Sequence, residues 1–393
     1  MAAENGTQRS SLKEFLASIA TIKGDLSNIT APPFVLADKS TTEFPRYWIE
    51  HPDLFCAPAH EKDPARRMLA VLKWFLSSLK DQQYAGRNPK DGIKKPLNAV
   101  LGEVFIGDCG PAEDVTKMVA EQVSHHPPVT ACYLWNDQHG VRAEGYTRQE
   151  ITFSGTVNIQ QTGHATLHLD EFDEDYLIPL PNVKVQGILS GSPYPELVGS
   201  HSIVSSSGYI ADVDFSGKKL LGMSGKKNHL EAKIFKLTNK KRSGPIFTAE
   251  GSWSDRFEFK DSAENVIDSY DVASAQSAGF RVAPIEEQDP WESRKAWGGV
   301  IRSIQAGDMQ GVADNKSKLE NAQRELRKQA ETSEESWRPL FFRKESRHDA
   351  AQKLLSEVGE TLAMDQTKGV WRFDREAAAT LQRPWRGKLT PFR

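Results

Sequence analysis

Residues 121–128 read Glu-Gln-Val-Ser-His-His-Pro-Pro, which sets two adjacent imidazoles directly before two adjacent prolines. Each proline fixes its own φ and has no backbone N–H to donate. Pro127 also favours an extended backbone at His126. The stretch is therefore stiff and non-helical, and it presents two side chains that can each donate a hydrogen bond to an anion. From the residues alone, the alternative is an ordinary proline turn with two surface histidines.

The chain beyond this stretch alternates apolar and polar residues with the two-residue period of β-strands, from about Leu97 onward. A glycine irregularity is expected at Gly155. So many consecutive strands without intervening helices predict a mainly antiparallel sheet, rolled into a barrel or a sandwich. A large barrel can enclose a ligand cavity. The apolar positions of the pattern are Ile151, Phe153, Val157, Ile159, Val183, Val185, Tyr209, Ala211, Val213, Phe215, Leu230, Ala232, Ile234, Phe247, Ala249 and Trp253.

Helices are predicted on both sides of the strand region. Residues 11–14 have the form of a capping box, and apolar residues then recur at helical spacing until Gly24. Two interpretations of this short amphipathic helix stay open: permanent packing on the core, or a mobile element that touches a membrane. Residues 65–79 carry a wide apolar face typical of a core helix, and residues 316–328 are rich in helix formers. The polar composition of residues 329–370 favours a flexible stretch.

Composition and charge limit the possible partners. The 393 residues carry a net charge of −3 with a sequence pI near 6.4, so the chain as a whole offers no strong field for nucleic acid. Its three cysteines, Cys56, Cys109 and Cys132, are far apart and form no zinc pattern, which fits a reduced cytosolic protein. The sequence shows neither a signal peptide nor an apolar run long enough to span a bilayer. We therefore expect a soluble, monomeric protein whose anion sites are local.

Two further clusters combine charge with hydrogen-bond donors. Lys95 is held by the following proline, and Asn98 comes three residues later. Lys316, Glu320 and Arg324 recur every four residues and so share one helix face. The simpler explanations are an ordinary strand entry for the first cluster and, for the second, a surface ladder of ion pairs worth about a few tenths of a kcal/mol each. A lysine and an arginine that flank a positioning glutamate are also suited to binding phosphate.

The sequence carries no signature of a catalytic site. HExxH, GxSxG and Walker motifs are absent, and no GxGxxG lies between a strand and a helix. His125 and His126 lack a third metal ligand at a plausible spacing and an identifiable nucleophile to activate. We therefore expect no enzymatic activity, no cofactor and no metal. A hydrolase that uses the histidine pair is the alternative, and unchanged ligand chemistry after long incubation would exclude it.

Taken together, these residues resemble the oxysterol-binding protein family. Residues 121–128 match the family fingerprint, and the resemblance runs in the expected order from the N-terminal helix to about Phe373. Because no pleckstrin-like domain or ankyrin block comes before it, the chain is similar to the short, single-domain fungal type. Further matching blocks are KPLN at 95–98, LGE at 101–103, EQ at 287–288, ESRKAW at 292–297, the spaced set Lys316, Glu320 and Arg324, and WRF at 371–373.

The resemblance implies a lipid-transfer protein of the α+β class. The implied architecture is a large, incomplete antiparallel β-barrel around a hydrophobic lipid tunnel, with an N-terminal amphipathic lid helix and a C-terminal helical region. Within this one domain, residues 1–29 would form the lid segment. Residues 30–285 would form the helical lead-in and the barrel, and residues 286–393 the C-terminal helical region with its basic tail.

The resemblance also assigns site residues. Thr147 and Leu12 depart from the types found in sterol-binding relatives, Asn and an aromatic residue respectively, and both departures bear on sterol affinity. The residues implied at the sterol tunnel and lid are Phe15, Ile19, Trp48, Gln83 and Tyr84. The residues implied at the headgroup of phosphatidylinositol 4-phosphate are Lys95, Asn98, His125, His126, Lys316, Glu320 and Arg324.

The function implied is exchange of a sterol against phosphatidylinositol 4-phosphate between membranes, with both lipids competing for one tunnel. The expected partners are membrane lipids and membrane surfaces, not nucleic acid, and no tethering partner is identifiable. The expected location is the cytoplasm, with transient binding to Golgi and endoplasmic-reticulum membranes. The alternative is a regulator that sequesters the phosphoinositide and transfers little sterol.

Overall fold

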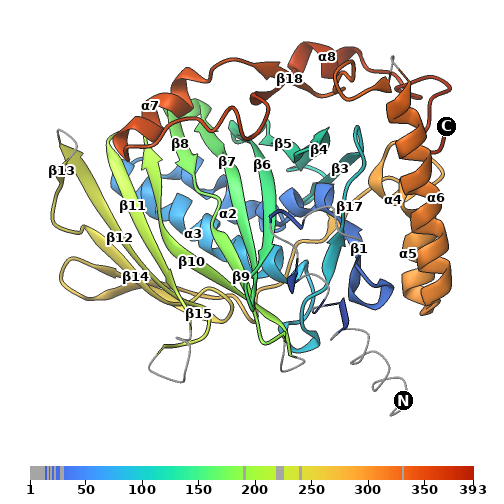
Figure 1. Cartoon of the computed structure of the whole chain (residues 1–393). Helices are drawn as coiled ribbons and strands as arrows, with labels where there is room; N and C mark the ends of the chain where they lie inside the picture. Colours follow the sequence, from blue (N-terminus) through green and yellow to red (C-terminus); the bar gives the residue numbers. More distant parts are fainter. Residues whose placement is uncertain are drawn as a thin grey trace.

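The computed structural model describes residues 14–15, 17, 20–21, 24–26, 31–188, 192–217, 225–238, 241–329 and 332–393. Within these residues, one antiparallel sheet contains 15 strands. It curves around helix α3 (Pro64–Tyr84), as Figure 1 shows. In space the strands follow the order β16-β15-β14-β12-β11-β10-β8-β7-β6-β5-β4-β3-β17, with β13 paired to β12 and β9 to both β10 and β7. Because β16 and β17 end this order without pairing to each other, the described sheet is open. The predicted α+β class and antiparallel sheet are confirmed.

The apolar positions of the predicted two-residue pattern fall within these strands, except Trp253, which lies in the turn after β14. The one irregular point of the pattern, Gly155, lies in the turn between β6 and β7 with φ +82°, so the segment around it is a hairpin instead of one interrupted strand. The strands of the sheet are β3 (Val104–Cys109), β4 (Thr116–His125), β5 (Pro128–Asn136), β6 (Val141–Phe153), β7 (Val157–Leu169), β8 (Glu174–Ile178), β9 (Asn182–Gln186), β10 (Tyr194–Ser205), β11 (Tyr209–Ser216), β12 (His229–Thr238), β13 (Lys241–Arg242), β14 (Phe247–Ser252), β15 (Arg256–Asp261), β16 (Val266–Asp271) and β17 (Phe280–Arg281).

The remaining elements precede the sheet, follow it or connect its strands. No helix among the described residues is long and apolar enough to cross a bilayer. Before the sheet lie η1 (Pro33–Val35), β1 (Leu36–Ser40), η2 (Thr41–Trp48), α2 (Pro52–Cys56), η3 (Ala57–His60), α3, η4 (Pro89–Asp91) and β2 (Lys95–Leu97), and η5 (Asp170–Phe172) connects β7 to β8. After the sheet come α4 (Ser293–Ala296), α5 (Gly298–Ala306), α6 (Met309–Lys328), β18 (Phe342–Glu345), α7 (Asp349–Glu357), β19 (Val370–Phe373) and α8 (Arg375–Thr380).

The main apolar core lies between helix α3 and the sheet. Helix α3 begins at Pro64, whose missing N–H costs nothing at the first helical position because that N–H would have no intrahelical acceptor. The Asp63 side chain caps the helix by accepting a hydrogen bond from the Ala65 amide at 2.8 Å. The apolar face of the helix packs against the inward side chains of the strands, such as Leu230 and Ile234 on β12. Ala232 between them is buried as well, whereas Glu231 and Lys233 are exposed, as the two-residue period predicts.

The C-terminal part of the chain packs on the outer face of the sheet. Figure 1 shows it running along the top of the sheet through α7, β18 and α8, while α5 and α6 stand at the side. Phe342 on β18 and Trp371 on β19 cover Val123 and Tyr133. The segment at 332–370 therefore contains more regular structure than its polar composition suggests.

The described part of the N-terminal segment lies against the hairpin of β6 and β7. Phe15 is partly buried, and Leu26 is buried against Ile151 and Phe153. The Leu26 amide donates to the Ile151 carbonyl at 2.6 Å, and the Ile151 amide donates to the Asp25 carboxylate at 2.9 Å. These two bonds fix the segment to the hairpin.

Candidate anion-binding site

The turn that carries the two histidines joins β4 to β5 and is held by a distant carboxylate. One oxygen of Glu334 accepts hydrogen bonds from the backbone amides of His125 at 3.0 Å and His126 at 2.7 Å, and from the Ser124 hydroxyl at 3.2 Å. Its other oxygen lies 3.1 Å from His126 Nδ1. The imidazoles are therefore oriented by Glu334 as well as by the prolines.

Glu334 is ionised at neutral pH. Burial alone would raise its pKa, but the bonds from the His126 and His125 backbone and the His126 ring lower the pKa to about 2. Lys368 adds a further contact at 3.2 Å. Sequence reasoning missed both Glu334 and Lys368, because neither belongs to a local motif and the chain brings Glu334 back 208 residues after His126.

The start of the same stretch has a structural role. The buried Glu121 carboxylate accepts hydrogen bonds from the backbone amides of Leu340 and Phe341, both at 2.8 Å. The Gln122 side chain accepts a bond from Thr130 on the neighbouring strand at 2.7 Å. These contacts hold the C-terminal segment and strand β5 against β4, which keeps the turn in place.

His125 is an imidazole with unused hydrogen-bonding capacity. Its Nδ1 is buried and has no hydrogen-bond partner in the part of the chain that the structure describes. Burial lowers the pKa of His125 to about 4, and the positive charges of Arg327 and His126 act in the same direction. Glu334 opposes them only in part. The ring is therefore neutral at neutral pH.

Lys95 is a second partly buried basic group with a lowered pKa. It opens strand β2, and Asn98 follows one residue after that strand ends. Burial lowers the pKa of Lys95 to about 8, with the nearby Lys316 ammonium acting in the same direction and Glu320 opposing both. Within the described ranges, the Lys95 ammonium forms no hydrogen bond or ion pair.

Helix α6 presents the third cluster on one face, as predicted. Glu320 is hydrogen-bonded to Lys316 and lies 3.9 Å from an Arg324 guanidinium nitrogen. Arg324 is 57% exposed and also donates to Asn321 at 2.6 Å. The ladder of ion pairs is thus formed, and it also faces Lys95, since Lys316 and Glu320 both act on the Lys95 pKa.

The packing of α6 explains why these clusters meet. Val312 and Leu319 on the buried side of α6 belong to one apolar cluster with Leu97 and Val100, which come one residue before and two residues after Asn98. The exit of β2 is therefore fixed against the helix. Lys95 is linked electrostatically to Lys316 on α6, and the His125 turn to Arg327 on the same helix.

The residues assigned to the sterol end lie elsewhere. Trp48 and Tyr84 are buried in the apolar cluster between α3 and the sheet, and Gln83 is half-buried on the last turn of α3. Phe15 is partly buried at the base of the N-terminal segment. Ile19 lies outside the described residues, as does Leu12.

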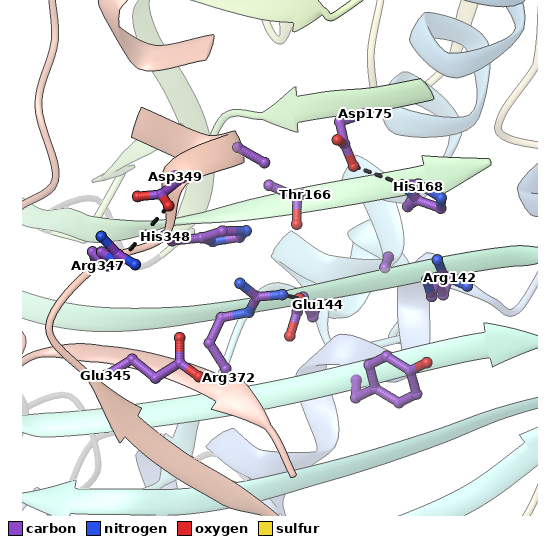
Figure 2. A pocket seen from close by; sticks show the side chains of 13 residues that line it. Arg142, Glu144, Thr166, His168, Asp175, Glu345, Arg347, His348, Asp349 and Arg372 are labelled. Atoms are coloured by element: carbon purple, nitrogen blue, oxygen red, sulfur yellow. Dashed lines mark hydrogen bonds and ion pairs between the residues drawn. The ribbon is translucent and has the colours of Figure 1, made fainter. Parts of the chain in front are cut away.

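A pocket of about 370 Å³ lies on the outer face, away from all of these residues. Figure 2 shows its charged lining, which comes from β6, β7 and the segment around α7. The charges pair with one another: Arg372 with Glu144, and His168 Nδ1 with Asp175 at 2.8 Å. The pocket is therefore largely neutralised by its own residues.

Comparison with known proteins identifies the family. The sequence model described as "Oxysterol-binding protein" matches residues 15–299 and 300–379. The chain belongs to the oxysterol-binding protein family. A Hormonema carpetanum family relative named probable transporter efuK is 57% identical over 95% of this chain, although the chain spans only 54% of that protein's length. Protein kes1 of Schizosaccharomyces pombe is 40% identical over 94% of this chain and 95% of its own.

Solved structures show the same fold. The Osh1 ORD domain, in a crystal structure described as a complex with ergosterol, superposes with a TM-score of 0.70 at 20% identity and covers 92% of this chain and 86% of its own. The Osh3 ORD of Saccharomyces cerevisiae, described in complex with PI(4)P, gives a TM-score of 0.64 at 21% identity over 82% and 84% of the two chains.

Proposed function

We propose that this member of the oxysterol-binding protein family binds phosphatidylinositol 4-phosphate at the site formed by Lys95, Asn98, the two histidines and α6. The observation that carries the proposal is the pair Lys95 and His125. Both are partly buried basic groups whose pKa values are lowered by burial and by a neighbouring cation. Among the described residues, neither has an anionic partner at hydrogen-bonding distance.

A phosphoinositide headgroup would supply the anionic partner that Lys95 and His125 lack. It carries a phosphodiester and a phosphomonoester on one ring, so its negative charges would face several basic groups at once. Each basic group would then recover its charge, because a nearby anion raises the pKa of a lysine or histidine. Asn98 and Glu320 would bond to hydroxyl groups of the inositol ring or orient the basic side chains.

The apolar interior between α3 and the sheet would hold the second lipid, a sterol, in competition with the phosphoinositide acyl chains. Relatives support both ligands, since Osh1 and Osh3 structures are described with ergosterol and with PI(4)P. Neither lipid would be changed chemically. Loading one would require release of the other, so a phosphoinositide gradient between Golgi and endoplasmic-reticulum membranes would drive sterol transport through the cytoplasm.

Displacement from loaded protein tests the exchange. The protein is first loaded with labelled sterol from liposomes, and liposomes containing phosphatidylinositol 4-phosphate are then added. We expect the sterol to be released in proportion to the phosphoinositide extracted. Liposomes with phosphatidylinositol are the control. Extraction of the phosphoinositide by protein that takes up no sterol would contradict exchange and leave sequestration.

The lowered pKa of Lys95 predicts a pH-dependent affinity. If a phosphate restores the charge of Lys95, then binding above the free pKa of about 8 must take up a proton. Affinity for a short-chain phosphoinositide should then be about tenfold weaker at pH 9 than at pH 7, whereas the phosphomonoester, whose second pKa is about 6, is already ionised throughout. Calorimetry at constant ionic strength measures this. Lys95→Met is the control, because it should bind weakly at both pH values. A wild-type affinity that does not change with pH would refute the role of Lys95.

The N-terminal segment would act as the lid of the apolar interior, and Leu26 would fix its base. Leu26→Asp places a charge among Ile151 and Phe153, so the segment should detach and bound sterol should dissociate several-fold faster. The dissociation rate of a fluorescent sterol measures the effect. Ala20→Asp puts the same charge on an exposed residue of this segment and should leave the rate unchanged. Equal rates in the wild type and Leu26→Asp would exclude a lid held at Leu26.

A further inference from the structure

Arg327 continues the basic face of α6 beyond the residues that match the family pattern. It follows Arg324 by three residues, so the two side chains lie on the same face of the helix. Among the charges that act on His125, that of the Arg327 guanidinium is the strongest. Arg327 therefore lies on the same face of α6 as Arg324, and its charge acts on the unpaired imidazole.

The hydrogen-bonding state of Arg327 differs from that of its neighbours. Its Nη1 is buried without a partner in the described part of the chain. By contrast, Arg324 donates to Asn321 at 2.6 Å, and Lys328 donates to Glu325 at 2.7 Å. A buried N–H of a charged group that makes no hydrogen bond is costly, so its retention calls for a partner that binds from outside.

The carboxylate of Glu334, whose charge acts on Arg327, does not fill this role. Glu334 exerts a favourable charge effect on Arg327 but forms neither a hydrogen bond nor an ion pair with it in the described structure. Its oxygens already accept bonds from the His125 and His126 amides and from Lys368. The Nη1 of Arg327 is thus available to donate a hydrogen bond to a ligand.

We propose that Arg327 is an additional ligand of a phosphate group at the proposed headgroup site, acting beside His125. This inference rests on the proposed function and names a residue that deepens it. Lys95 and His125 lose charge when buried, whereas a guanidinium stays protonated in a protein. Arg327 would therefore supply permanent charge at depth, and its planar group would offer paired N–H donors to one phosphate.

The test compares Arg327→Gln with Lys328→Gln, which removes the same charge from the next residue, a side chain that is 70% exposed. Calorimetry with short-chain phosphatidylinositol 4-phosphate gives the affinity, and uptake of labelled sterol reports on the fold. We expect Arg327→Gln to bind the phosphoinositide about ten- to a hundredfold more weakly, with sterol uptake within about twofold of wild type. Lys328→Gln should match the wild type in both.

The outcomes separate the two proposals. If the wild type does not bind the phosphoinositide at all, the proposed function fails. If the wild type binds it and Arg327→Gln binds it equally well, the inference about Arg327 is overturned and the proposed function stands. The ligand-free protein adds a readout of geometry, since Arg327→Gln should raise the pKa of His125 measured by NMR, and Arg327→Lys should keep it low.

If Arg327→Gln also loses sterol uptake, the variant has lost its fold and cannot test the role of Arg327. A measurement on the wild-type protein then tests the proposal. In protein labelled with ¹⁵N-arginine, the Arg327 guanidinium signal is assigned with Arg327→Lys. It should shift and sharpen when short-chain phosphatidylinositol 4-phosphate is added, because a bound phosphate restricts the group. A signal that does not respond while the ligand binds would overturn the proposal.

Discussion

Replacing His125 and His126 together with alanine should abolish extraction of phosphatidylinositol 4-phosphate and leave sterol uptake intact. The Nδ1 of His125 is buried and unpaired in the described structure, and the ring lies 4.7 Å from that of His126 in an edge-to-face contact. Each ring can donate a hydrogen bond to a phosphate. Since hydrogen bonds to charged groups contribute about 1.5–3 kcal/mol each, losing both should weaken binding by more than about a hundredfold.

The measurement is sedimentation of liposomes followed by assay of each lipid in the protein fraction. His60 and His139 provide a matched control, because they form another contacting pair, with nitrogens 2.9 Å apart, outside the proposed site. Their double alanine variant should extract the phosphoinositide normally. Equal loss of phosphoinositide and sterol in the His125 and His126 variant would assign these residues to folding instead of binding.

The comparison of sequence and structure shows which parts of this site local patterns can predict. Lys316, Glu320 and Arg324 lie on one helix face because their spacing alone dictates it. The same spacing rule extends to Arg327, so this residue could have been proposed from the sequence. The strands around β12 were predictable for a similar reason, since burial of every second side chain leaves a two-residue period.

The parts that could not be predicted depend on contacts between distant segments. The sequence suggests that Pro127 and Pro128 alone orient the imidazoles, whereas the structure adds Glu334, a residue in a polar stretch with no motif. Lys368 joins it from yet another segment. Such partners become neighbours only after the C-terminal chain has packed across the outer face of the sheet, and periodicity carries no information about that path.

Glu103→Leu should have the largest effect on stability. The Glu103 side chain is fully buried, and its oxygens accept hydrogen bonds from Thr42 at 2.9 Å, Ser293 at 2.6 Å, the Val100 amide at 2.9 Å and the Trp297 indole at 2.8 Å. Leucine has a similar size but accepts no bond. Because each buried donor left unsatisfied costs about 1–3 kcal/mol, and burial of leucine offsets part of this, we expect the free energy of unfolding to fall by roughly 3–5 kcal/mol.

Chemical unfolding followed by tryptophan fluorescence measures the change, with Glu113→Leu at an exposed position as the control that should shift the midpoint little. Glu103 joins two of the matching sequence blocks, since Ser293 and Trp297 belong to the second. Its partner Trp297 packs in one apolar cluster with Val312 and Leu319 of α6, the helix that carries Lys316 and Arg327, so the role of Glu103 is to hold α4 against the start of β3. If Glu103→Leu kept wild-type stability but lost phosphoinositide binding, Glu103 would belong to the ligand site, and the division between binding and supporting residues drawn from the histidine variants would be wrong.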